Sequence, residues 1–177
     1  PSRRSTVMGM RVDSYAFLPR SFRAMYAEPP RVEGHDEPVW APFEKRLSGA
    51  KMALLSSAGL FVQGEQESFD LQRERGEPGW GDPSWRAIPA STAQGELGMA
   101  HLHVNDTDTT ADHEVSLPLR ALDALVDDGI VGASAATHYS VMGYQATGLN
   151  DWRRTTGPEI AARLRREDVD ALVLAPT

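Results

Sequence analysis

The stretch GMAHLHVNDTDTTADHEVSLPLRALDALVDDGIVGASAATHYSVMGY, residues 98–144, decides most of what the sequence predicts about fold and chemistry. Four of the five histidines of the chain lie in it, with a group of acidic residues. Residues 99–104 are typical of a short strand, in which successive side chains alternate between faces. We therefore expect His101 and His103 to point the same way at the carboxyl end of a strand, where open α/β sheets form their ligand crevices.

The segments around this stretch alternate between expected strands and helices. Residues 51–57 form an unbroken apolar run followed by a glycine-containing turn, which is typical of a buried parallel strand. Residues 64–81 are expected to form a long loop, and the apolar period does not decide the structure of residues 133–144. The further expected elements are strands at 85–89 and 169–175 and helices at 116–128, with Ser116 as N-cap, and 157–167.

This order of elements predicts an α/β fold with a mostly parallel sheet flanked by helices, over residues 51–177. Residues 1–50 contain several prolines and aromatic side chains without a clear period. Proline fixes its own φ and favours an extended residue before it, so we expect an extended N-terminal arm. The arm is expected to pack on its own domain or on a neighbouring subunit, and the sequence favours neither.

Composition restricts the expected partners. The net charge of −7, with basic residues scattered along the chain, argues against nucleic acid as a partner. No apolar run reaches the roughly 18 residues of a membrane span, so no membrane partner is expected and a cytoplasmic location is the default. The chain has no cysteine, which excludes thiolate metal sites and cysteine nucleophiles within it. Neither GxxxxGK[ST] nor GxGxxG is present, so no nucleotide cofactor is indicated.

Histidines are the strongest candidates for chemistry. His101 and His103 on one strand, with His138 after an intervening helix, suit a divalent metal such as zinc, iron or copper. The same three imidazoles also suit acid–base catalysis near neutral pH. The alternative is that they form a hydrogen-bonded crevice lining without a metal. His35 and His113 are expected to be solvated.

Other candidate residues lie near the expected strand ends. Asp106 is a candidate catalytic base or an orienting group, and Tyr139 is a candidate hydrogen-bond or proton donor. Ser56 and Ser57 are expected to bind an anionic substrate group together with backbone amides of the next turn. Arg86 is expected to bind a substrate carboxylate through its planar guanidinium, with a structural ion pair to nearby Asp82 as the alternative.

Four segments together resemble the selenoprotein B subunits of glycine, sarcosine, betaine and D-proline reductases. They are GDPSWRAIP (81–89), HLHVNDTD with the downstream VSLPLRALDALVDDGIVG (101–132), THYSVMGY (137–144) and DVDALVLAPT (168–177). The order of these motifs carries the resemblance, which covers residues 17–177. It implies reductive cleavage of a carbon–nitrogen bond in a small amino-acid-like substrate, with a selenocysteine or cysteine nucleophile, in a multi-protein complex.

The sequence departs from the family pattern where the family's nucleophile is expected. In many relatives the nucleophile follows a strand like ALVLAPT, whereas this sequence stops at Thr177 and contains no cysteine. Phe61 also stands where a histidine is expected in relatives. Either the chain stops short of the nucleophile or this member has abandoned thiol or selenol chemistry, and we expect the second because the sequence is 177 residues in full.

Two classes of function are therefore open. The first is an enzyme on the reductase scaffold that acts on a small polar amine or amino acid, with a histidine-bound metal in place of the thiol. The second is a non-catalytic subunit or binding module. The apolar strand expected at 169–175 has no covering helix after it, so we also expect a homodimer or a tight protein partner.

Overall fold

The computed structural model describes residues 41–77, 79–145 and 147–177. Internal contacts divide the chain into two units, residues 1–43 and 44–177, and every described helix and strand belongs to the second unit. Most of the arm expected over residues 1–50 lies outside the described residues. None of the described helices is long and apolar enough to cross a bilayer.

A central strand, β1, organises the main sheet. On one side it pairs in parallel with β7 over its length, and on the other side with β5 near its start and with β6 near its end. Among the described strands of this sheet only β3 is antiparallel, next to β6, so the mostly parallel sheet predicted from the sequence is confirmed. The strands of this sheet are β1 (Lys51–Ser56), β3 (Trp85–Pro89), β5 (Ala133–Ser134), β6 (Thr137–Val141) and β7 (Ala171–Ala175).

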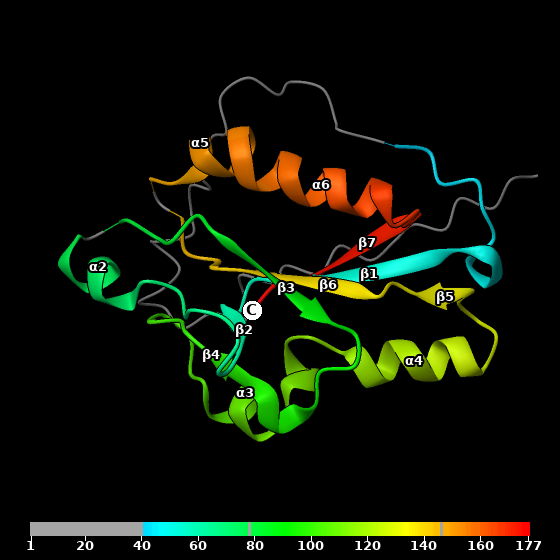
Figure 1. Cartoon of the computed structure of the whole chain (residues 1–177), viewed down its shortest axis with the longest axis horizontal. Helices are drawn as coiled ribbons and strands as arrows, with labels where there is room; N and C mark the ends of the chain where they lie inside the picture. Colours follow the sequence, from blue (N-terminus) through cyan, green and yellow to red (C-terminus); the bar gives the residue numbers. More distant parts are fainter. Residues whose placement is uncertain (1–40, 78, 146) are drawn as a thin grey trace, which may run out of the picture. The chain divides into compact units, whose positions relative to one another are not determined.

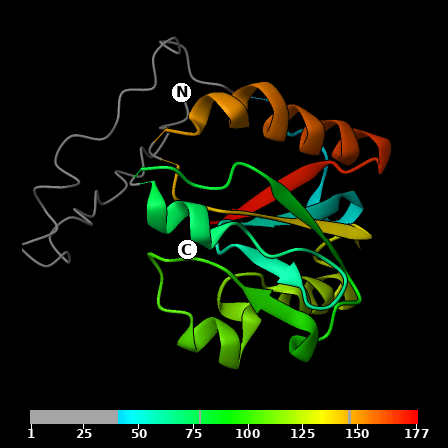
Figure 2. The ribbon, with the colours of Figure 1, turned by 60° about the vertical axis from the view of Figure 1, so that its left-hand side comes forward.

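Two further strands form a small antiparallel pair, and helices cover both faces of the main sheet. The pair consists of β2 (Leu60–Val62) and β4 (Leu97–Met99). Figure 1 shows α6 on one face of the sheet and α4 on the other, and Figure 2 shows the same layers from the side. The helices are α2 (Leu71–Gly76), α3 (Thr107–Ala111), α4 (Leu119–Asp127), α5 (Leu149–Asp151) and α6 (Gly157–Arg166), with a π-helical turn at Trp152–Thr156 and 3-10 turns at Leu47–Gly49, Gln94–Glu96 and His113–Val115.

Each face of the sheet buries its own apolar cluster. Leu54 packs with Ile88 and Leu122 in a cluster on the α4 side, whereas Ala53 packs with Ile160 in a cluster on the α6 side. Adjacent residues of β1 are therefore buried on opposite faces. This double burial explains why the strand is an unbroken apolar run in sequence rather than an alternating one.

The helix predicted over 116–128 is confirmed in type but begins later. Pro118 is the residue before α4, and the helix contains Leu119–Asp127. Ser116 is not the N-cap, because its buried hydroxyl lies 3.0 Å from that of Thr109. Gly129 follows with a φ of +68°, the left-handed conformation that often ends helices.

Three further expectations are corrected. The strand expected over residues 99–104 ends at Met99, because Asn, Asp and Thr in the next segment favour turns and a short helix. The loop expected over 64–81 contains α2, which Asp70 caps by accepting a hydrogen bond from the Arg73 amide. Residues 133–144 contain both β5 and β6.

We predict that Leu54→Ala and Leu122→Ala each lower the free energy of unfolding by roughly 2–5 kcal/mol, the usual cost of a buried leucine truncation. Their side chains are 3% and 5% exposed. The matched control is Leu125→Ala in the same helix, because Leu125 is 40% exposed. Urea denaturation checks the result, and equal losses for all three variants would contradict the assignment of the core.

Candidate functional site

The candidate site lies where the loops after β1, β4 and β6 meet. The Ala100 amide donates to the Gly59 carbonyl, and the Gly143 amide donates to the Ser57 carbonyl. Beneath these loops Ala100 packs against Phe69 and Met142 in a small apolar cluster. The carboxyl ends of parallel β1 and β6 thus support one surface, as expected for a ligand site of an α/β sheet.

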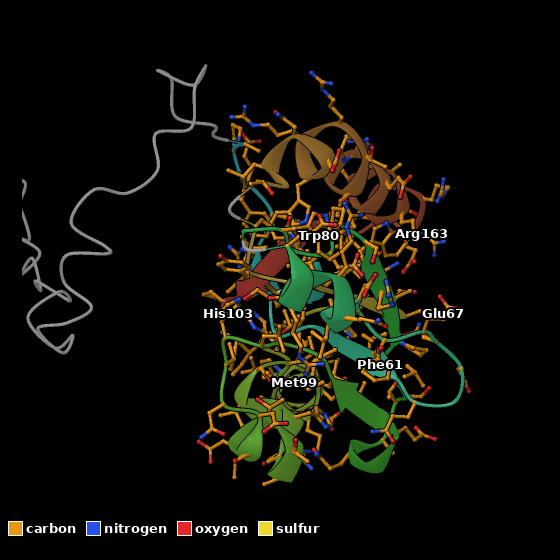
Figure 3. The ribbon with its side chains drawn as sticks, turned by 90° about the vertical axis from the view of Figure 1, so that its left-hand side faces the viewer. Phe61, Glu67, Trp80, Met99, His103 and Arg163 are labelled. Carbon is orange, nitrogen blue, oxygen red and sulfur yellow. The ribbon has the colours of Figure 1, made fainter. Side chains whose placement is uncertain are left out.

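Four polar or aromatic side chains gather on this surface. His103 Nε2 lies 3.0 Å from Glu74 Oε1, and the His103 ring lies 4.0 Å from the Tyr144 ring between centroids. The His101 and His103 rings are 6.1 Å apart, and His101 Nδ1 accepts a hydrogen bond from the His103 amide. Figure 3 shows His103 beside α2, which carries Glu74. We call these four residues the His103 cluster.

Burial differs sharply between the two members of the ion pair. The Glu74 side chain is 1% exposed and that of His103 is 48% exposed. Neither carboxylate oxygen of Glu74 accepts a well-aligned hydrogen bond from the described residues. Burial therefore raises the pKa of Glu74, and the neighbouring His103 partly offsets the rise. A buried carboxylate thus faces an imidazole that reaches solvent.

His101 is a neutral group at physiological pH. Burial, and secondarily repulsion from His103, lowers the pKa of His101 from 6.5 to about 4. Because Nδ1 accepts the His103 amide, the proton of the neutral ring is on Nε2. His101 therefore offers one N–H donor without a charge.

His138 lies elsewhere, inside the sheet on β6. Its Nδ1 accepts a hydrogen bond from the Leu54 amide of β1 at 3.0 Å, and its Nε2 lies 3.3 Å from the Ser134 hydroxyl. The ring is fully buried, and burial lowers its pKa. Both ring nitrogens therefore have structural partners, so the structure gives His138 the role of joining β1 to β5 and β6.

The three histidines predicted to bind metal are thus not brought together as a ligand set. Within residues 41–77, 79–145 and 147–177, no three His, Asp or Glu side chains are arranged to hold a metal ion. His101 and His103 are adjacent, as the sequence predicted, but through a turn and not through a strand. Metal binding itself stays a prediction.

The other predicted catalytic residues, Tyr139 and Asp106, make no described hydrogen bond or ring contact with the His103 cluster. Tyr139 is fully buried, packs its ring against Trp85, and has no hydrogen-bond partner for its hydroxyl among the described residues. Burial, followed by the charge of Glu167, raises the pKa of Tyr139. Asp106 is exposed just before α3, and no hydrogen bond within the described part of the chain involves its carboxylate.

The predicted substrate-binding residues are already engaged in the fold. Ser56 is buried and its hydroxyl accepts from the Ala58 amide, whereas the Ser57 hydroxyl accepts from the Thr177 amide. The Arg86 guanidinium donates to the Glu67, Ser68 and Trp85 carbonyls and to the Ser84 hydroxyl. It also stacks on Phe69, and burial lowers its pKa. A substrate role for these residues stays a prediction, and their observed contacts are structural.

Sequence reasoning missed Glu74 and Tyr144. Glu74 lies in the segment that was expected to be a loop, and an Asp70 N-cap was the available signal for a helix there. Tyr144 ends the THYSVMGY motif, but nothing in the sequence indicates that its ring stacks on His103.

The comparisons with known proteins indicate a distant relationship to a reductase subunit. The relative is the D-proline reductase subunit gamma of Acetoanaerobium sticklandii, which is 30% identical over 140 residues. The alignment covers 77% of this chain and 52% of the relative, so the chain spans about half the length of the curated relative it matches. No family model and no solved structure matches the chain.

We predict that His138→Leu destabilises the fold by roughly 1–3 kcal/mol, because it leaves the buried Leu54 amide without an acceptor. His138→Gln retains an acceptor at the same position and should recover part of the loss. Chemical denaturation measures both variants. Unchanged stability of His138→Leu would show that this hydrogen bond does not join the strands.

We predict that His101 weakens the fold as the pH falls from 6.5 to about 4. In this window the unfolded chain protonates His101 while the folded chain does not, so the unfolded state binds more protons. His101→Asn keeps an acceptor for the His103 amide and removes the titration. The melting temperature of the variant minus that of the parent should be larger at pH 4.5 than at pH 7.5. The same difference at both pH values would contradict the prediction.

Proposed function

We propose that this chain is a component of a reductase acting on a small amino-acid-like substrate such as D-proline, with the His103 cluster as its proton-donating site. The observation that carries the proposal is the contact of half-exposed His103 with buried Glu74. The distant relationship to a D-proline reductase subunit supports the reaction class and the choice of substrate.

The reaction explains why such a pair is useful. Reductive cleavage of a carbon–nitrogen bond consumes two electrons and two protons, and the nitrogen leaves more readily when a proton reaches it. His103 is exposed enough to touch a ligand, and its Nε2 lies 3.0 Å from the carboxylate of buried Glu74. His101 adds a neutral N–H donor that can orient a substrate carboxylate. These 177 residues contain no thiol, so the electrons are assigned to a group outside them.

A bound metal is a second form of this proposal. A zinc, iron or copper ion would take His101 and His103 as ligands and polarise the substrate. The contacts of His138 do not support it as the third ligand, because both of its ring nitrogens have partners. Titration of the chelator-treated protein with Zn²⁺ tests this form, and the absence of saturable binding would reject it.

A non-catalytic subunit is the alternative function. The relative is itself a subunit, which favours a protein partner for this chain. We propose that the chain works within an assembly, either as a homodimer or with another subunit. A stable hetero-complex without any D-proline binding to this chain would favour the non-catalytic alternative.

We predict that the purified protein binds D-proline and that His103→Gln and Glu74→Gln each weaken binding about tenfold or more, as expected when ~1.4 kcal/mol of a charge-assisted contact is lost. Isothermal titration calorimetry measures the affinity. Glu77→Gln is the matched control, because Glu77 follows the same helix and pairs with Arg73 in solvent. Equal affinities for all variants would contradict the proposal.

A further inference from the structure

The outer edge of β7 has no partner strand among the residues that the structure describes. β7 pairs in parallel with β1 over five residues, from Ala171 to Ala175, and no other described strand pairs with it. Val173 is 41% exposed and Leu174 is 64% exposed. Successive strand side chains point to opposite faces, so apolar surface is open on both faces of this edge. The strand contains none of the charges or prolines that commonly protect an edge from pairing.

The pairing of β7 with β1 determines which backbone N–H and C=O groups of β7 point to the open edge. The Ser57 amide donates to the Ala175 carbonyl, so Ala175 presents its hydrogen-bonding groups to β1. In a parallel ladder every second residue does so, and Val173 therefore also faces β1. The N–H and C=O groups of Leu172 and Leu174 consequently point to the open side.

The sequence of β7, ALVLA, is the same in both directions. We propose that β7 pairs antiparallel with β7 of a second copy of this chain, across a two-fold axis at Val173. Leu172 then lies opposite Leu174 of the second copy, and each such pair exchanges both backbone hydrogen bonds. This is an isologous interface, in which the same surface serves both subunits.

Other two-fold registers leave outward-pointing carbonyl groups of β7 without a donor. An axis at Leu174 sets Leu172 opposite Pro176, which has no N–H to donate. An axis at Leu172 sets Leu174 opposite Asp170, whose amide already donates to the first carbonyl of β1. If the two β7 strands are shifted by one residue, the outward-pointing backbone groups of one strand lie opposite residues whose backbone groups point to their own β1. The register centred on the middle of the strand satisfies all the open groups.

Charge does not oppose a second copy as the occupant. The centre of the interface is uncharged, and the axis places Asp170 of the two copies at opposite ends of the ladder. α6 runs opposite to β7 on one face of the sheet (Figure 1), so the axis sets α6 of the two copies antiparallel on that face.

The inference deepens the proposed assembly and does not depend on the reductase chemistry, and a cysteine scan of the full chain tests it. The parent contains no cysteine, so each variant carries a single thiol. Directly opposed residues of a non-hydrogen-bonded pair lie about 4.5 Å apart between Cα atoms, within the range of a disulfide. Val173→Cys should therefore form a covalent dimer on mild oxidation. Leu174→Cys and the exposed control Val115→Cys should not.

Light scattering on the uncross-linked proteins completes the test. The parent should be a dimer at micromolar concentration, and Val173→Lys should weaken the dimer about tenfold or more, because like charges would be directly opposed. Val115→Lys is the matched control and should remain dimeric. A monomeric parent, a dimer unaffected by Val173→Lys, or faster cross-linking at position 174 than at 173 would overturn the proposal. D-proline affinity is measured separately, so failure of the proposed dimer can be distinguished from failure of the proposed function.

Discussion

The centre of the main sheet contains a hydrogen bond in which a buried imidazole accepts from a backbone amide. β1 pairs with β5 at its start and with β6 at its end, and between them the Leu54 amide is bonded by His138 Nδ1. Leu54 also belongs to the apolar cluster under α4, so the ring supports strand pairing and packing together. A buried amide without an acceptor is costly, which explains why this position holds a neutral histidine.

This arrangement separates the histidines by role. His138 is buried within the sheet, whereas His101 and His103 lie in the turn after β4, beside a buried glutamate. Only the second group combines an exposed polar side chain with a buried charge partner. The distant reductase relationship and the position at the strand ends give this group its proposed function.

The sequence predicted the parts of the fold that local pattern controls. The runs that became β1, β3, β7 and α6 were identified within about two residues, because each is apolar with a clear period or a glycine or proline at its boundary. Predictions were wrong where contacts between distant segments decide the outcome. His113 was expected to be solvated but is 3% exposed, and Glu74 was assigned to a loop although it is buried in α2.

We propose that Glu74 and His103 act as one unit on a small amino-acid substrate. A double-mutant cycle of Glu74→Gln and His103→Gln, read as D-proline affinity, tests it most directly. We predict strong non-additivity, with the double variant binding no more weakly than either single variant, because each change removes the same unit. Additive losses, or D-proline binding that neither residue affects, would contradict it.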